Sequence, residues 1–403
     1  MRSFLFSLAI VCSWALPAQH LIIGDIIDSV RTDSMLLYVE QMSGEVAVDL
    51  GEGAVTISSR HSDNPLNAVA QQYYEQKFAS WGYTPTAQAF NATGRNVLVT
   101  KTGSLYPDEI VILCAHYDAL PAGMFNAPAA DDDGSGCAAV LEAARILQDI
   151  PFERTIVFAL WDQEEQGKIG SIYYANSMAG NDENIVGVVN MDAIAWDGNG
   201  DKKARVHARP VANSMAIADT MFAIHDRYDI DIDLLLTTPG ATYSDHASFW
   251  SAGYGAVLMI EEFTGDPNPF YHTMNDRVEH FDVPYFEKLA KLSIGSMAAL
   301  AVPYDPSAAV SGRDPMAGPH IYAYPNPATT DVQVWLEVSE PSAYRIEMID
   351  AVGKVVYPGV EYALSQGKRS TTFDMSALVP GSYTVVTHGA NGVRAAVKVL
   401  RIP

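Results

Sequence analysis

The sequence predicts an α/β fold in which a mostly parallel central sheet is covered by helices on both faces, followed by a small C-terminal antiparallel β-sandwich. Short apolar runs alternate with segments of helical periodicity over the first three quarters of the chain. The 403 residues are 48% hydrophobic, which is enough to bury a large core and indicates two domains. From about residue 323 the pattern changes to closely spaced alternating strands, which indicates the sandwich.

The N-terminal segment "MRSFLFSLAIVCSWALPAQ" has the pattern of a secretory signal peptide, which we assign to residues 1–18. One arginine precedes an apolar stretch, and small residues follow it, so we expect cleavage after Ala15 or Ala18. The apolar stretch is too short to span a bilayer as a mature helix. No later segment has 18 uninterrupted apolar residues, so we expect no transmembrane segment in the mature chain.

The acidic charge and the low cysteine content of the chain limit its expected binding partners and its disulfide content. The net charge is −23, and seven basic and seven acidic residues lie from residue 323 onward, so the whole excess belongs to the first part of the chain. Such an acidic surface argues against nucleic acid and anionic membranes, and it favours metal cations. Beyond the leader only Cys114 and Cys137 remain, which is not a disulfide framework.

The elements follow from periodicity. Two helices are expected, at 66–83 and at 136–148, the second with Val140, Leu141, Ala144 and Leu147 on one face. The segment around 302–331 is rich in Pro, Gly, Ser and Ala, and it predicts a linker at 305–322 between a domain at 19–304 and one at 323–403. The expected strands of the first domain are 96–100, 110–115, 155–161, 185–191 and 255–260.

Acidic residues and histidines follow these strands, at the carboxyl ends where such sheets carry their sites. Imidazoles and carboxylates without thiolates are suitable ligands for a pair of zinc ions that share one bridging carboxylate. Any one of these short motifs is more often a capped loop, but their succession at strand ends favours a metal site. The residues are His116 and Asp118, Asp131 to Asp133, Glu164 and Glu165, Asp192, and His272.

The motifs "HYDA", "ADDDGSG", "DQEEQGKIGS", "VNMD", "YSDHASF" and "YHTMND" resemble those of the di-zinc aminopeptidases of the bacterial leucyl aminopeptidase type, also called the aminopeptidase Y and S family. The resemblance runs from about residue 58 to 300 and implies the zinc exopeptidase fold. It implies that Asp132 bridges two zinc ions, with His116 and Asp192 on one ion and Glu165 and His272 on the other. It also implies a cis peptide bond after Asp132.

The same resemblance assigns the catalytic roles. Glu164 is left free of metal, and we expect it to act as the general base that takes a proton from the attacking water and delivers it to the leaving amine. Asp118 is expected to orient His116, since residues two apart on a strand point the same way.

The substrate side departs from the family pattern. Well-studied members carry a disulfide and an oxyanion-stabilising tyrosine in the loop before "SDHAS", whereas this loop reads "TTPGATYSDHAS" and has no cysteine. Tyr243, directly before the serine, is a candidate replacement. Phe263, Phe270 and Tyr271 lie near His272 in sequence and either line an apolar specificity pocket or belong to the core.

Residues 323–403 contain short strands separated by the turns "NPATT", "DAVGK" and "GANG". The segments "YPNPA", "DMSALVPGSY" and "KVL" resemble the sorting domains of the type IX secretion system. That resemblance implies the type IX secretion machinery as a partner, and a secreted or cell-surface location in a Gram-negative bacterium. A carbohydrate-binding or spacer module is the alternative.

Together these features predict a secreted zinc aminopeptidase, a metallopeptidase that removes N-terminal residues from peptide or protein substrates. The alternatives are a metal-dependent carboxypeptidase, a glutaminyl cyclase-like enzyme, and a non-catalytic binding ectodomain. A cyclase works with one zinc, whereas this chain carries ligands for two. Receptor-like relatives lose ligands or the base, and all of these residues are present here.

Overall fold

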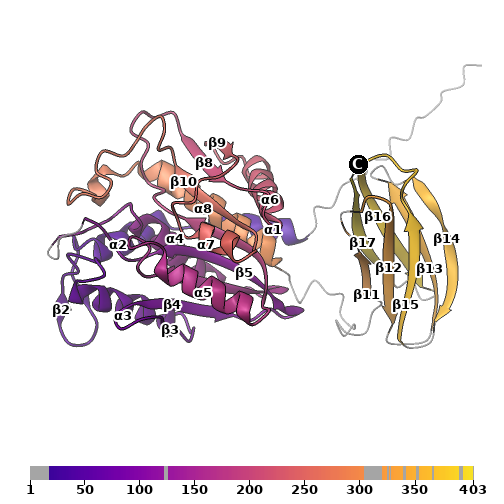
Figure 1. Ribbon diagram of the computed structural model, residues 1–403, viewed down its shortest axis with the longest axis horizontal. Coiled ribbons are helices and arrows are strands. Elements are labelled where there is room, and N and C mark those ends of the chain that lie inside the picture. The colour runs from indigo at the N-terminus through magenta and orange to yellow at the C-terminus, as the bar shows by residue number, and fades with distance from the viewer. Residues whose placement is uncertain are drawn as a thin grey trace, which may run out of the picture. The chain divides into compact units, whose positions relative to one another are not determined.

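The computed structural model describes residues 18–121, 126–303, 320–324, 326, 328–338, 342–350, 354–364, 367–389 and 394–402. The chain divides into two compact units, Met1–Asp305 and Pro306–Pro403 (Figure 1). Residues 1–17 of the expected signal peptide and most of the expected linker lie outside the described residues. Strand β11 (His320–Tyr324) begins within the last residues assigned to that linker.

An eight-stranded sheet forms the centre of the first unit, in the order β3-β4-β6-β5-β7-β10-β8-β9. The four central strands β6, β5, β7 and β10 are parallel, as are β8 and β9, while the remaining neighbours pair antiparallel. All five expected strands are present. Their bounds are β3 (Thr86–Ala89), β4 (Arg95–Lys101), β5 (Tyr106–His116), β6 (Arg154–Trp161), β7 (Asn184–Met191), β8 (Lys203–His207), β9 (Asp233–Thr237) and β10 (Ala256–Glu261).

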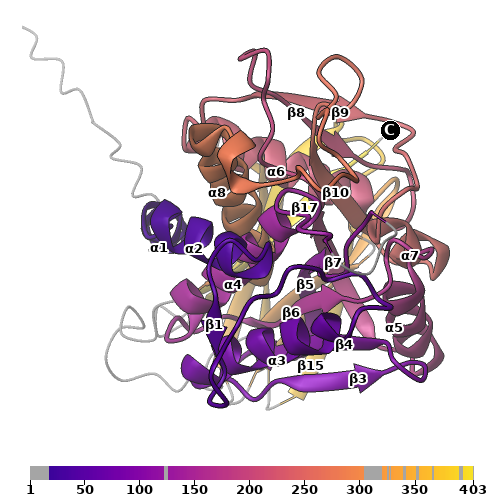
Figure 2. The ribbon, with the colours of Figure 1, turned by 90° about the vertical axis from the view of Figure 1, so that its left-hand side faces the viewer.

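Helices cover both faces of this sheet, because the central strands are apolar on both sides. In β5, Leu113 belongs to the core that contains α4 and α8, and the neighbouring Cys114 belongs to the core that contains α5 and α7. Figure 2 shows α5 and α7 on one side of the strands and α1, α2 and α4 on the other. The predicted fold class is therefore confirmed. The helices are α1 (Ala18–Asp28), α2 (Thr32–Met42), α3 (Pro65–Ser80), α4 (Gly134–Leu147), α5 (Ile169–Gly180), α6 (Ser214–Arg227), α7 (His246–Ser251) and α8 (Val283–Ala301).

Helix α3 shows how local chemistry sets the ends of an element. Asn64 caps its start by accepting a hydrogen bond from the Leu66 N–H, and Pro65 occupies the first turn. The helix ends at Ser80, three residues before the end that periodicity predicted. Gly82 takes a φ of +82°, which turns the chain back, and the Tyr83 N–H bonds to the Phe78 carbonyl.

The second unit consists of two antiparallel sheets around their own apolar core, which includes Val334, Ile346 and Val385. One sheet has the order β11-β12-β15 and the other β14-β13-β16-β17 (Figure 1). The expected antiparallel C-terminal domain is therefore present. The remaining strands are β12 (Asp331–Val338), β13 (Ser342–Asp350), β14 (Val355–Leu364), β15 (Gly367–Asp374), β16 (Gly381–Gly389) and β17 (Arg394–Arg401).

Two further sequence predictions concern membranes and disulfides. Within the described part of the chain, no helix is both long and apolar enough to cross a membrane. Cys114 and Cys137 are both buried free thiols.

Candidate metal centre

The parallel strands deliver polar side chains to one edge of the sheet. His116 is the last residue of β5, Asp192 directly follows β7, and Glu165 lies shortly after β6. Asp132 lies just before α4, and His272 lies in the loop after β10. Because β6, β5 and β7 are neighbours and run in the same direction, their carboxyl ends meet at this edge.

The structure brings all five expected ligand residues together as two triads that share Asp132. The first triad is His116, Asp132 and Asp192, and the second is Asp132, Glu165 and His272; in each, the candidate ligand atoms lie within 4.8 Å of one another. His116 Nε2 lies 3.1 Å from Asp132 Oδ1 and 3.7 Å from Asp192 Oδ1. On the other side, His272 Nε2 lies 3.0 Å from Asp132 Oδ2 and 3.2 Å from Glu165 Oε2. One carboxylate thus faces both imidazoles.

The donor set fits a pair of divalent cations. Asp132 Oδ2 and His272 Nε2 are close, yet neither makes a hydrogen bond, and Glu165 Oε1 is also buried without a partner. Burial and repulsion from Asp132 raise the pKa of Glu165 to about 7. Three carboxylates and two imidazoles with buried, unsatisfied atoms need positive charge between them, and imidazole and carboxylate ligands suit zinc.

The two aspartates beside Asp132 hold the main chain around the site. Asp133 accepts hydrogen bonds from the N–H groups of His116, Gly136 and Ala193, so it ties the ends of β5 and β7 to the start of α4. Asp131 accepts from the Ala195 N–H. The peptide bond between Asp132 and Asp133 is cis, as the family resemblance implied. The acidic triplet therefore combines one candidate ligand with two structural anchors.

Two further carboxylates fix the ligand-bearing backbone. Asp276 accepts from the N–H groups of Asp131 and Asp132 through its two oxygens. Asp118 accepts from the N–H groups of Glu164 and Glu165 at 2.9 and 3.2 Å. We expected Asp118 to orient His116; its carboxylate lies 3.6 Å from His116 Nδ1, while its main-chain carbonyl is closer, at 3.3 Å. The closest contacts of the Asp118 carboxylate are thus with the glutamate pair.

Arg60 is a supporting residue that no sequence motif indicated. Its fully buried guanidinium donates to four main-chain carbonyls, those of Met42, Tyr117, Pro128 and Ala129. It thereby joins the end of α2, the segment after β5 and the loop that leads into the acidic triplet.

We expect Arg60→Met to lower the free energy of unfolding by about 2–5 kcal/mol, because four buried carbonyls lose their charged donor. The variant also avoids the cost of burying the guanidinium, which offsets part of this loss. Urea denaturation measures this change. Arg95→Met is the matched control, since that guanidinium donates only to loop carbonyls near the surface, and we expect a change within about 0.5 kcal/mol. Equal effects in the two variants would contradict the role given to Arg60.

Glu164 lies beside the triads but belongs to neither. Its side chain is buried, and burial raises the pKa of its carboxyl well above the usual value, with repulsion from Asp245 and Asp192 adding to the shift. A buried carboxyl group that lies beside the candidate metal centre and outside both triads has the position that a general base requires.

Three of the four candidate substrate-binding aromatics form one row that begins at His272. Tyr271 stacks on His272 with ring centroids 3.8 Å apart, Phe263 meets Tyr271 at 5.1 Å, and Tyr243 meets Phe263 at 6.4 Å. Phe270 points elsewhere, stacking on His280 at 3.7 Å.

His207, at the end of β8, sets the orientation of Tyr243. Burial and nearby Arg205 lower its pKa to about 4, so it is neutral at pH 7. The Ala241 N–H donates to Nδ1 at 3.0 Å, which leaves the proton on Nε2, 3.4 Å from the Tyr243 hydroxyl oxygen. The tyrosine can therefore accept from His207 and direct its own proton elsewhere.

Residues 96–297, which include all five candidate ligands, match the sequence profile of peptidase family M28. The chain belongs to peptidase family M28. Residues 322–400 of this M28 chain match the secretion system C-terminal sorting domain. The resemblances seen in the sequence are thus confirmed at the level of the family.

Relatives of this M28 chain include aminopeptidase YwaD of Bacillus subtilis, 29% identical over 197 residues that cover 47% of this chain and 41% of the relative. Leucine aminopeptidase 1 of Trichophyton rubrum is 27% identical over 266 residues, with 63% and 69% covered. The chain spans about half the length of several curated relatives that it matches.

Solved structures share the fold of this M28 chain. The LapA aminopeptidase of Legionella pneumophila has a TM-score of 0.60 at 20% identity, covering 71% of this chain and 76% of its own. A glutaminyl cyclase of Porphyromonas gingivalis has a TM-score of 0.54 at 16% identity, covering 67% and 98%. Both activities occur on this fold, so the site residues have to distinguish them.

Proposed function

We propose that the first unit is a zinc aminopeptidase that removes N-terminal residues from peptides. The observation that carries the proposal is the pair of triads that share Asp132, with the free carboxylate of Glu164 beside them. His116 and Asp192 would hold one zinc ion, and Glu165 and His272 the other. When bound, such ions polarise a carbonyl and acidify water.

The protein residues supply the proton transfers. Glu164 takes a proton from the attacking water and passes it to the leaving amine. Asp118 accepts hydrogen bonds from the Glu164 and Glu165 N–H groups and thereby fixes the positions of the base and the neighbouring ligand. Tyr243, with His207 bonded to its oxygen, is free to donate its proton to the developing oxyanion.

The aromatic row supports a preference for apolar N-terminal side chains. Phe263 and Tyr271 are half-buried, and Tyr243 is 48% exposed, so the row presents ring surface to solvent next to His272. When an apolar substrate side chain covers these rings, its own apolar surface and the ring surface are both removed from water. Phe270, stacked on His280, is left out of this proposal.

Two measurements on the purified full chain test this function. Elemental analysis after dialysis should find about two zinc ions per chain. In a panel of aminoacyl anilides, carboxyl-blocked peptides, N-blocked peptides and N-terminal glutaminyl peptides, the first two should be hydrolysed, the N-blocked peptides should stay intact, and the glutaminyl peptides should not be cyclised. Full activity with a single tightly held ion, cleavage from the carboxyl end, or cyclisation of the glutaminyl peptide would each reject the proposal.

The proposed location is outside the cell or on its surface, with the second unit recognised by type IX secretion machinery. The match of residues 322–400 to a secretion sorting domain supports this location. The peptidase domain at 19–304 and the sorting domain at 323–403 are proposed as the functional boundaries, joined by a linker at 305–322.

Ending the chain after Ala309 is expected to leave an active peptidase, because each unit has its own apolar core. The activity should match that of the full chain, and the unfolding temperature should match that of the first unit within the full chain. In a host with type IX secretion, the shortened protein should stay in the periplasm while the full chain leaves the cell. An insoluble or inactive product would show that the second unit completes the catalytic fold.

A further inference from the structure

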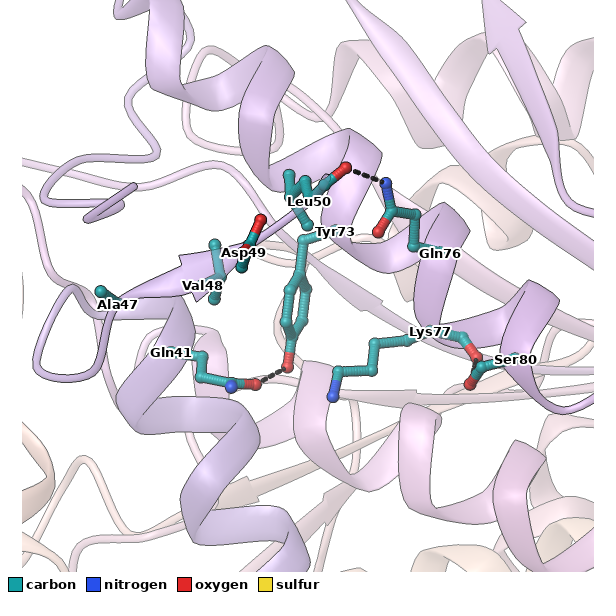
Figure 3. Close-up of a pocket in the computed structure, with 9 residues that line it drawn as sticks. All are labelled: Gln41, Ala47, Val48, Asp49, Leu50, Tyr73, Gln76, Lys77 and Ser80. Atoms are coloured by element: carbon teal, nitrogen blue, oxygen red, sulfur yellow. Dashed lines mark hydrogen bonds between the residues drawn. The ribbon is translucent and has the colours of Figure 1, made fainter. Parts of the chain in front are cut away.

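A cavity of about 270 Å³ lies among α2, α3 and the hairpin formed by β1 (Val48–Asp49) and β2 (Ala54–Val55) (Figure 3). Its walls include Gln41, Tyr73 and Lys77, together with the half-buried Leu50, while the lining residue Val48 is almost completely buried. None of its lining residues belongs to the two triads or to the aromatic row. The volume is at the small end for ligand sites, so it suits a molecule of few heavy atoms.

Lys77 projects into this cavity without an oxygen partner among the described residues. Its ammonium lies 5.2 Å from the ring centroids of both Tyr38 and Tyr73, which hold it by cation–π attraction. The side chain is half-buried, and burial lowers its pKa. Lys101 is buried to a similar degree but donates to the Gln148 carbonyl at 2.9 Å. A partly desolvated cation that makes no ion pair among the described residues is one that an anion can stabilise.

A second donor faces the same space. The Tyr73 hydroxyl donates to Gln41 Oε1 at 2.5 Å, which fixes the amide and leaves both Nε2 hydrogens available. Figure 3 shows the Gln41 amide nitrogen and the Lys77 ammonium on either side of the Tyr73 hydroxyl. Asp49 also lines the cavity; its Oδ1 accepts from the N–H groups of Gly51 and Gly53, so this carboxylate is held by the hairpin and not by Lys77.

We propose that this cavity binds a small organic carboxylate, with the anion beside the Lys77 ammonium and the Gln41 amide and a short apolar chain against Leu50. A carboxylate accepts two hydrogen bonds side by side, which matches an ammonium and an amide at the same opening. The Leu50 side chain offers such a ligand an apolar contact that inorganic anions cannot use. The carboxylate can come from a free short-chain acid or from the C-terminus of a peptide.

Methyl NMR of the full, metal-loaded chain tests the proposal, with butyrate for the free acid and N-acetyl-leucine for a peptide C-terminus. Roughly millimolar binding is expected, because the ligand is small and uses one charged contact. The Val48 and Leu50 methyl signals should shift with one or both acids. Butyramide and N-acetyl-leucinamide, which are neutral and of the same shape, should cause no shift, and chloride at equal ionic strength should cause none. Which acid binds more tightly identifies the source.

Lys77→Met should weaken binding by about tenfold or more, whereas Lys101→Met should leave it unchanged. Lys77→Arg, which keeps the charge, should retain most of the affinity and shows that loss in the methionine variant is not a folding defect. Because carboxylates also bind metals, the titration is repeated after chelation. The proposal would be overturned if binding survived Lys77→Met, disappeared with the metal, or occurred equally with the amides. It would also be overturned if no binding were seen up to roughly 50 mM, which is 50-fold above the expected dissociation constant.

Discussion

Replacing Glu164 by glutamine is expected to lower the rate of peptide hydrolysis by about 10²–10⁴-fold, because the variant keeps the shape of the side chain but cannot accept a proton. Zinc content and unfolding temperature should barely change, since Glu164 belongs to neither triad. Steady-state kinetics with an aminoacyl anilide, paired with elemental analysis of the same sample, measures both effects. The loss should appear in kcat rather than in KM, because the proton transfer occurs in the chemical step.

The neighbouring residue provides the matched control. Glu165→Gln removes a charged oxygen that lies 3.2 Å from His272 Nε2, so zinc affinity and activity should fall together. Added zinc should restore part of the activity of this variant and none of the activity of Glu164→Gln. If the first variant lost zinc and the second kept it, the two roles would have to be exchanged.

Asp132→Asn should impair both metal sites at once, since this is the carboxylate that the two triads share. Partners that only orient metal ligands are worth about 10–100-fold in affinity, so losing a shared ligand should cost more than about 100-fold at each site, and activity should be lost with the metal. Calorimetric titration of the metal-free protein with zinc measures the two affinities.

Asp192→Asn distinguishes a shared ligand from an unshared one. Asp192 belongs only to the triad with His116, so this variant should keep one ion, held by Glu165 and His272 with Asp132. If Asp132→Asn also kept one ion with ordinary affinity, Asp132 would not bridge the sites.

The parts of the fold that could be predicted are those whose sequence pattern is local. The runs that form β5, β6, β7 and β10 are apolar on both faces, which marks buried strands regardless of their partners. Only α3 and α4 were predicted individually among the helices; α1 begins at Ala18, at the edge of the apolar leader, which hid its pattern. Strands β8 and β9 are five residues each, too short for a reliable periodicity.

The candidate ligands could be anticipated because each follows a recognisable strand, and parallel strands end together. The supporting contacts could not. The bonds from Arg60 to the Ala129 carbonyl and from the Asp131 N–H to Asp276 join segments 69 and 145 residues apart. His207 belongs to none of the sequence motifs, and its partner Tyr243 lies 36 residues further on. Such pairings depend on tertiary packing, which no local pattern encodes.

The spread of the triads along the chain makes metal binding report on completed folding. Their members lie on five segments between His116 and His272, and Asp133 joins three of those segments only after β5, β7 and α4 have assembled. An unfolded chain has no comparable site, so the free energy of metal binding adds to that of folding the first unit. Chelation should therefore lower the unfolding temperature of this unit by an amount that grows with the logarithm of the metal affinity. The second unit contributes no residue to either triad and should unfold at an unchanged temperature.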